Sequence, residues 1–291
     1  MKDFLKYTMA SCLGVFLAGA VFFFLFFAII AGIIASTGGG GGKTTITTGS
    51  VLALDFTQYM PEQTNNLSKQ SFDFSEHDVP GLHDVARLIR HAAEDKKING
   101  ILIENGLGGL GASSAKVILD ALEDFKESDK FLAAYGDFYT QQGYYLASPA
   151  DHITLHPVGT VDFRGFASYV PFFKGLLDKI GIDMQIYYAG NFKSATEPFR
   201  RTEMSPENKL QTREYLTDTY DMYLQDIADA RQINVDSLKN MAWQFQIKSA
   251  DDALRYKLVD EIGAKADCES WMNEKMGKGQ NDRITYINIE E

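Results

Sequence analysis

The chain has 291 residues, of which 45% are hydrophobic and 23% charged, and its formal net charge is −11 at pH 7. The hydrophobic content is sufficient for a packed core and excludes an intrinsically disordered chain, while the length allows one large domain or two small ones. The acidic balance excludes binding of nucleic acid through a basic face, which needs clustered lysine and arginine.

An uncharged apolar segment lies near the amino terminus. Leu13 to Ile34 is a run of 22 residues, and as a helix it would extend about 33 Å, enough to cross the ~30 Å apolar layer of a bilayer. This length predicts a retained transmembrane helix at residues 13–35, because a cleaved signal peptide has an apolar region of roughly 7–15 residues. The small residues Ala18-Gly19-Ala20 leave cleavage open as an alternative.

The charges that flank this segment indicate its orientation. Lys2 and Lys6 precede it, and only Lys43 follows it closely. By the positive-inside rule, residues 1–12 are expected in the cytoplasm and the rest of the chain on the exported side. Cys12 and Cys268 then lie on opposite sides of the span, so no intramolecular disulfide is expected.

A glycine-rich stretch follows the apolar segment. Gly38–Gly42 precede Lys43-Thr44, which invites comparison with a phosphate-binding loop. That motif would require a glycine in place of Thr37 and a strand before it, and neither is present. We therefore expect residues 36–50 to be a flexible tether.

Short apolar strands and amphipathic helices alternate after the tether. Strands are expected as continuous apolar runs and helices from apolar residues at helical spacing. The predicted order is strand Val51–Asp55, helix 81–96, strand Ile98–Glu104, helix Ser113–Glu127 and strand Lys130–Tyr135. This order predicts an α/β fold with a mostly parallel sheet flanked by helices.

A glycine-rich turn, Asn105–Gly111, joins the second of these strands to its helix. Its backbone N–H groups could stabilise an oxyanion, or the glycines could simply allow a tight turn. A dinucleotide-binding role is less consistent with the sequence, because the glycine spacing departs from G-x-G-x-x-G.

A candidate catalytic lysine lies in the second half of the chain. A strand is predicted at Met184–Tyr188, Gly190 permits a tight exit from it, and Lys193 precedes a helix start. A lysine held in an apolar cleft there could lose its proton, because desolvation disfavours the ammonium form. The neutral amine could then act as general base for a serine nucleophile. The adjacent Ser194 is a poor proton donor to Lys193 and is interpreted as a cap or orienting hydroxyl.

The region after Lys193 is predicted to be mainly helical. Glu197 is expected to form a structural ion pair with Arg200 or Arg201. Ser205 is expected to cap a long helix that begins at Pro206. Later predicted elements are helices Val235–Trp243 and Ala250–Tyr256, an amphipathic piece Cys268–Met276 and a strand-like run Ile284–Glu291.

Three rival motifs have weaker support. Ser113 and Lys116 satisfy S-x-x-K, but the other motifs of penicillin-recognising enzymes are missing and Ser113 is better explained as a helix cap. His152 and His156 share a strand face without a third metal ligand, so core or edge histidines are expected. A G-x-S-x-G nucleophile elbow does not occur, which disfavours an α/β-hydrolase.

Six segments occur in order along the chain: Gly143-Tyr144-Tyr145, Pro149–Leu155, Gly159–Phe166, Leu176–Gly181, Gly190–Phe199 and Glu203–Pro206. In their order and spacing they resemble the signal peptide peptidase A (protease IV) family of membrane-anchored Ser/Lys peptidases. The resemblance covers roughly residues 51 to 265. It implies a crotonase/Clp-protease-like α/β fold in this region.

The resemblance also assigns roles to two residues. Short members of the family carry a motif similar to Ala-Ser-Gly-Gly-Tyr-Tyr, in which serine is the nucleophile. Aligning Gly143-Tyr144-Tyr145 with it places Gln141 at the serine, and a glutamine amide cannot form an acyl-enzyme. This departure resembles the amino-terminal half of the long, two-half form, in which Lys193 would be the general base. The serine would then lie in a missing carboxyl-terminal half, and residues 266–291 would begin the connection to it.

The implied function is that of a serine endopeptidase that degrades cleaved signal peptides and other peptides, without cofactor or metal. The implied location is the bacterial inner membrane, crossed once, with the body in the periplasm and subunits assembled as a homotetramer. The isolated chain is expected to be inactive. Two alternatives remain open: a non-catalytic crotonase-like membrane scaffold, and an acyl-CoA-processing enzyme of the crotonase type.

Overall fold

The computed structural model describes residues 2–37, 46–57, 60–64 and 80–289. The chain divides into an amino-terminal helical unit and a body that begins at Ile46. Most of the predicted tether, including the glycine run and Lys43-Thr44, lies outside the described residues.

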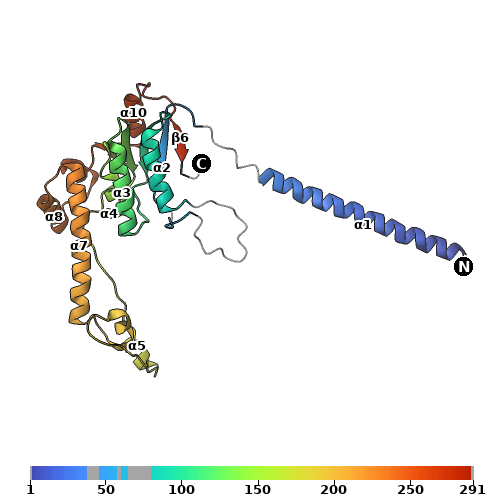
Figure 1. Ribbon diagram of the computed structural model, residues 1–291, viewed down its shortest axis with the longest axis horizontal. Helices are drawn as coiled ribbons and strands as arrows, with labels where there is room; N and C mark the ends of the chain where they lie inside the picture. The colour runs from blue at the N-terminus through green and yellow to red at the C-terminus, as the bar shows by residue number, and fades with distance from the viewer. Residues whose placement is uncertain (1, 38–45, 58–59, 65–79, 290–291) are drawn as a thin grey trace. The chain divides into compact units, whose positions relative to one another are not determined.

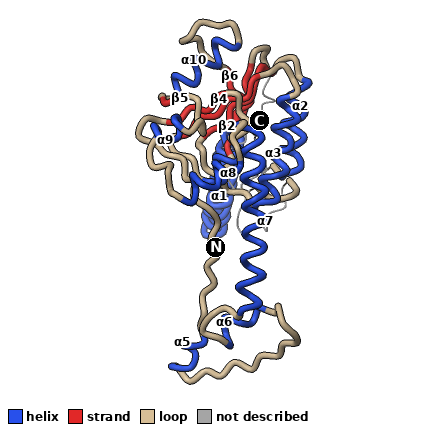
Figure 2. The backbone as a smooth tube through the Cα atoms, turned by 90° about the vertical axis from the view of Figure 1, so that its left-hand side faces the viewer, coloured by secondary structure: helices blue, strands red, loops and turns tan. Residues whose placement is uncertain are grey.

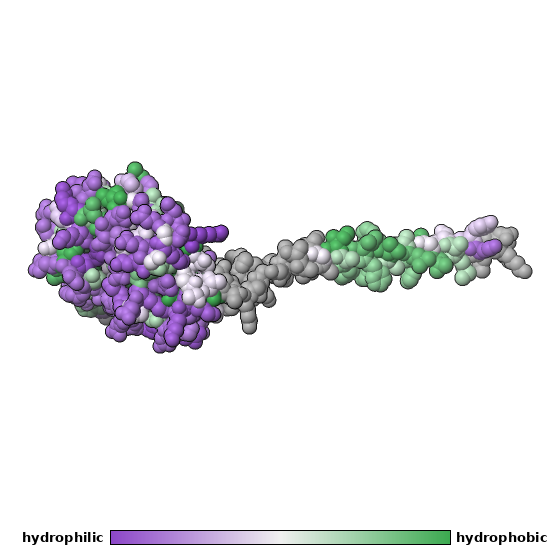
Figure 3. Space-filling view, turned by 90° about the horizontal axis from the view of Figure 1, so that it is seen from above, coloured by the Kyte–Doolittle hydropathy of each residue, from purple (hydrophilic) through white to green (hydrophobic). Residues whose placement is uncertain are grey.

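The amino-terminal unit contains one long helix, α1 (Lys2–Thr37). Within it, Lys6–Ile29 is long and apolar enough to cross a membrane, and none of that segment is buried. Figure 3 shows its apolar surface as a green band. Phe16, Phe22 and Phe24 of this helix are strongly exposed. The predicted apolar helix is therefore confirmed, and its composition fits a membrane anchor or a signal sequence.

The body is built on a parallel sheet of six strands in the order β5-β4-β3-β2-β1-β6. The strands are β1 (Ser50–Asp55), β2 (Ile98–Glu104), β3 (Phe131–Gly136), β4 (His152–Leu155), β5 (Glu261–Ile262) and β6 (Thr285–Asn288). Parallel strands need crossover connections, and α2 (Leu82–Glu94), α3 (Ala112–Lys126) and α4 (Gln141–Ala147) supply the first three (Figure 1). The predicted α/β class with a parallel sheet is confirmed.

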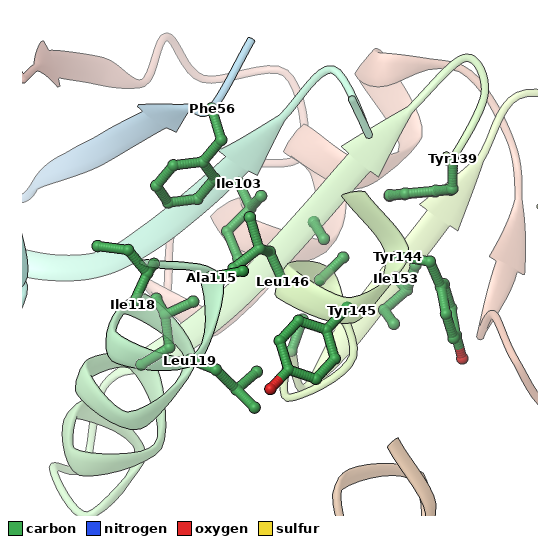
Figure 4. Packing of buried hydrophobic residues seen from close by; sticks show 14 of the residues in the cluster. Phe56, Ile103, Ala115, Ile118, Leu119, Tyr139, Tyr144, Tyr145, Leu146 and Ile153 are labelled. Carbon is green, nitrogen blue, oxygen red and sulfur yellow. The ribbon is translucent and has the colours of Figure 1, made fainter. Parts of the chain in front are cut away.

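Alternate side chains of the strands point to opposite faces of the sheet and supply two separate cores. On β2, Ile101 and Ile103 belong to the larger core, whereas Leu102 belongs to the smaller one. The larger core is completed by α2, α3 and α4, and Figure 4 shows Ile118, Leu119 and Tyr145 packed there. The smaller core is completed by α10 (Lys265–Lys275), which contributes Cys268 and Met272.

The remaining helices follow β4. They are α5 (Lys174–Lys179), the 3₁₀ helix η1 (Ser194–Thr196), α6 (Glu197–Arg200), α7 (Pro206–Arg231), α8 (Val235–Trp243) and α9 (Ala250–Arg255). The carboxyl-terminal part of α7 is buried through Tyr223, Leu224 and Ile227, and the helix contacts α4 and α8. Its amino-terminal part extends away from the sheet, with α5 and α6 at its far end (Figures 1 and 2). We call residues 167–205, which leave the body and return to the start of α7, the arm.

Two local predictions were wrong. Met184–Tyr188 is not a strand, because it lies in the arm, away from the six strands of the sheet, and no described strand pairs with it. Ser113 is not the cap of α3, since the helix begins at Ala112 and Gly111 occupies the cap position. Glycine is also tolerated at that position, because its backbone adopts the extended conformation of a cap without strain.

Candidate active site

The carboxyl ends of β1, β2 and β3 form the edge of the sheet where α/β proteins usually bind ligands. The glycine turn Asn105–Gly111 lies there and packs against the start of α4. A Cβ atom added to Gly143 would stand 1.8 Å from the Gly106 carbonyl oxygen. Asn105 and Gly106 also adopt positive φ angles of 72° and 58°. Close approach and turn geometry therefore explain glycine at these positions.

The same contacts argue against an oxyanion role for the middle of this turn. The Gly108 N–H donates to the Thr140 hydroxyl at 3.2 Å, and the Gly109 N–H donates to the Phe56 carbonyl at 3.0 Å. Both groups are thus engaged within the body. Of the two interpretations open from the sequence, the structure favours the tight turn.

Gln141 is the first residue of α4, directly after its cap. The Thr140 hydroxyl accepts a hydrogen bond from the Gly143 N–H at 3.0 Å, which fixes the start of the helix. The Gln141 Oε1 atom accepts hydrogen bonds from the backbone N–H groups of Arg164 at 3.1 Å and Gly165 at 2.9 Å. Gln141, which the family resemblance places at the nucleophile position, is thus hydrogen-bonded through its side-chain amide to the segment that leads into the arm.

Lys193 lies in the arm, apart from this sheet edge. It occupies the cap position of η1, so the predicted helix start beside it is confirmed. Its side chain is exposed, and among the described residues no carboxylate lies within ion-pair distance of it. It lines a hollow of about 500 Å³ together with Tyr187, Tyr188 and Phe192.

The apolar cleft predicted around Lys193 is not closed in the isolated chain. Tyr187 and Phe192 are 92% and 51% exposed. Apolar side chains lie beside the lysine, and in the part of the chain that the structure describes no further layer covers the exposed Lys193 side chain. Exposed apolar clusters of this kind mark surfaces that contact another molecule.

A buried carboxylate holds the arm to the start of α7. Glu197 is 3% exposed and accepts hydrogen bonds from the Ser205 N–H at 3.1 Å and the Asn208 side-chain amide at 2.9 Å. Its ion pair with Arg200, at 3.6 Å, confirms the prediction. Burial raises the pKa of Glu197, but these hydrogen bonds and the Arg200 cation outweigh it and hold the pKa below its usual value.

The rival motifs form structural contacts. Lys116 of the S-x-x-K motif pairs with Asp120 at 2.8 Å and with Asp226 at 3.2 Å. Burial lowers the pKa of Lys116, but the bonds to these two carboxylates raise it above its usual value, so the side chain stays cationic. His152 bonds Glu261 at 2.8 Å and stacks on Trp271, which joins β4 to β5 and α10. In the part of the chain that the structure describes, no group of three potential metal ligands occurs.

The residues that engage Gln141 were not identified from the sequence. Arg164 and Gly165 contribute only their backbone N–H groups. Because almost every residue has such a group, the residue types give no indication of this contact. Gly165 belongs to a segment of the family resemblance, Gly159–Phe166, but nothing in that segment indicates a partner 24 positions earlier in the chain. Only the fold brings the two together.

Comparison with known proteins shows matches along most of this chain. The model of "Peptidase family S49" matches residues 124–278, which is more than half of the chain. Protease 4 of Haemophilus influenzae is 30% identical over 264 residues, covering 85% of this chain and 43% of that protein. Protease 4 of Salmonella typhi is 34% identical over 208 residues, covering 67% of this chain and 33% of that protein.

A shorter match is to the "Putative signal peptide peptidase SppA" of Enterococcus faecium, 26% identical over 180 residues, covering 62% of this chain and 52% of that protein. The chain therefore spans less than half the length of the two Protease 4 relatives. The family model and the two Protease 4 matches agree with the parallel α/β body. The chain belongs to peptidase family S49, a family of serine peptidases.

Proposed function

We propose that this chain is the lysine-bearing part of a membrane-anchored Ser/Lys peptidase. The observation that carries the proposal is the position of Lys193, which lies in an open hollow lined by exposed aromatic side chains. A nucleophilic serine is then required from another segment, because Gln141 stands where the family motif has serine and is bonded to the backbone.

The chemistry needs a neutral amine beside a hydroxyl. The Lys193 amine would accept the proton of the serine hydroxyl as the serine oxygen attacks the peptide carbonyl. The resulting ammonium would return that proton to the leaving amine, and water would release the acyl group in the same manner. A serine-bearing domain that covers Tyr187 and Phe192 would exclude water from Lys193, and desolvation favours the neutral amine.

The apolar surface of the arm supports assembly with another domain. Tyr169 at 97% exposure and Tyr187 at 92% exposure would be unusual on a surface that faces only water. We infer that this surface meets the serine-bearing domain, and that a homotetramer is the assembled form. The arm then contributes one half of a shared active site.

The apolar α1 helix supports a location at a membrane. We infer a single pass through a bacterial inner membrane, with Lys2 and Lys6 in the cytoplasm and the body in the periplasm. Peptides left in or near the membrane, such as cleaved signal peptides, are then the substrates within reach. The name of the Enterococcus relative fits this substrate class.

The test combines this chain with a serine-bearing S49 domain and measures cleavage of a fluorogenic signal-peptide substrate. Lys193→Ala should reduce turnover by at least about a thousandfold, because removal of a general base for a nucleophile has effects of this order. Lys179→Ala is the matched control, since Lys179 is another exposed lysine of the arm. It should leave turnover unchanged.

Three results would contradict the proposal. Full turnover by Lys193→Ala in the assembled enzyme would indicate a scaffold role for this chain. Hydrolysis by the 291-residue chain alone, lost in Lys193→Ala, would show that no second domain is needed. Specific binding of an acyl-CoA thioester would favour a crotonase-type enzyme instead.

A further inference from the structure

The segment that leads into the arm is held by a short series of contacts with the body. The Tyr139 N–H donates to the Thr160 carbonyl at 3.0 Å, and the Asp162 N–H donates to the Tyr139 carbonyl at 2.7 Å. Two residues further along each segment, the Gln141 side chain accepts the N–H groups of Arg164 and Gly165. The Gln141 side chain thus continues the row of hydrogen bonds that the backbone groups of Tyr139 form with this segment. Among the described residues, its two bonds are the last that the backbone N–H groups of the segment make before the arm begins.

Aromatic side chains hold the next residue. Phe166 packs edge to face against Tyr220 and Tyr223 of α7, with ring centroids 5.5 Å and 5.1 Å apart. Tyr223 in turn stacks on Tyr145 of α4 at 3.8 Å. Gln141 therefore fixes the exit of the arm against α4, and Phe166 fixes it against α7. The stacked pair Tyr145 and Tyr223 joins these two helices.

After Phe166, the described backbone makes no hydrogen bond to the body until the start of α7 is reached. Among the described residues, no hydrogen bond joins residues 167–172 to any other element, and the next bond, from the Phe173 N–H to the Pro198 carbonyl at 2.7 Å, lies within the arm. The return path is α7, whose 26 residues give a length of about 39 Å. In the described part of the chain, the arm is thus attached at its start by the Gln141 and Phe166 contacts and at its end by α7.

We propose that Gln141 is a positioning residue that fixes the direction in which the arm presents Lys193. With its bonds removed, the start of the arm would be held only by the Phe166 ring contacts and by the bond that the Tyr220 hydroxyl donates to the Arg164 carbonyl at 3.4 Å. The direction of the arm would then be less well defined. A serine at this position could not take over this role, because its hydroxyl is one bond from Cβ whereas Oε1 of glutamine is three bonds away. The family's nucleophile position would thus have a structural role in this chain. The functional meaning of the inference rests on the proposed role of Lys193.

The test measures the arm directly, without peptidase activity. Spin labels are placed on the full chain at Tyr187→Cys in the arm and Val158→Cys in the body, both about 90% exposed or more, in a Cys12→Ser background. Cys268 is buried and would not be labelled. Distances between the labels are compared for Gln141→Met, which keeps the side-chain length without an acceptor, and Gln141→Glu, which keeps an acceptor oxygen.

We expect a narrow distance distribution for the unsubstituted chain and for Gln141→Glu, and a broad one for Gln141→Met. Amide exchange at Arg164 and Gly165 should be roughly tenfold faster in Gln141→Met, the change expected when one net hydrogen bond is lost. Gln225→Met, which removes only a helix-surface bond to Asp229, is the matched control and should change neither readout.

Unchanged distances and exchange in Gln141→Met would overturn the inference, and so would a broad distribution in Gln141→Glu with normal thermal unfolding. If Gln141→Met does not fold, Gln141→Ser replaces it, because the short hydroxyl cannot reach the two N–H groups, and the same broad distribution is expected. Failure of the proposed function would be distinguishable: Lys193→Ala would then retain turnover in the assembled enzyme, while the distances would still respond to Gln141→Met.

Discussion

Gly143 shows how one residue can be required for packing rather than for chemistry. It precedes the two tyrosines of the family motif, but its contacts explain it fully, since a Cβ atom would stand 1.8 Å from the Gly106 carbonyl oxygen and 2.9 Å from the Leu107 nitrogen. Neither neighbour is a flexible side-chain end that could move aside. The turn and the helix start would have to separate for any larger residue.

We therefore expect Gly143→Ala to lower the free energy of unfolding by at least about 2 kcal/mol, as overpacking of a rigid contact does. Gly111→Ala is the control in the same turn, because nothing lies within 4 Å of its added Cβ. Its cost should stay below about 1 kcal/mol. Urea unfolding of both variants checks this, and equal midpoints would show that the turn adjusts without strain.

At the residue scale, two of the local predictions are confirmed, the Ser113 cap is wrong, and the non-local contacts were missed. The cap at Ser205 is confirmed by its hydrogen bond from the Asn208 N–H at 3.1 Å, and the Glu197–Arg200 pair lies one helical turn apart. Both depend on sequence neighbours. The bonds of Gln141 join residues more than 20 positions apart through backbone groups, so no residue pattern could indicate them.

The junction between α6 and α7 depends on the charge of one carboxylate. Glu197 is the buried acceptor for Ser205 and Asn208, and its pKa in the folded state lies below the usual value of 4.5. Its contribution to stability is therefore complete above the unfolded pKa and is lost as the pH falls through the lower, folded pKa. Acid below about pH 4.5 should loosen the junction.

Glu197→Gln removes this titration. We expect the variant to be less stable than the unsubstituted chain at pH 7. The difference should begin to shrink as the pH falls below 4.5 and should disappear below the lower, folded pKa, where the native carboxylate is also protonated. Thermal unfolding of both proteins from pH 7 to pH 3 measures it. Glu203→Gln is the control, because that carboxylate is 70% exposed in the same arm. A difference independent of pH would refute the assignment.

At the element scale, predictions succeeded where the element is part of the core. Buried parallel strands are continuous apolar runs, and for this reason Ile98–Glu104 was predicted with its observed bounds. Met184–Tyr188 is an equally apolar run, but it lies on an exposed arm. The pattern of apolar residues predicts that a segment will be buried. It does not predict whether the segment is buried by its own domain or by another molecule.

At the scale of the whole molecule, the apolar surface is distributed unevenly. In the body, the apolar side chains of the strands are buried on both faces of the sheet. Many apolar side chains of α1 and of the arm are exposed. In the proposed function, a lipid bilayer covers α1 and the serine-bearing domain covers the arm. The proposal thus accounts for each of the two exposed apolar regions.

The division into two units predicts that the body folds without α1. Residues 46–290 form their own compact unit, and the two cores, as described, contain residues of the body. Deletion of residues 1–45 should therefore leave the thermal midpoint of the body within about 2 °C, less than the shift expected for a loss of 1 kcal/mol. The truncated protein should move from the membrane fraction to the soluble fraction, which fractionation and immunodetection would measure. A body that remained with membranes after washing in high salt would show that the arm or another apolar surface also binds lipid. Exposure of the arm would then no longer support its role as a docking surface for a second domain.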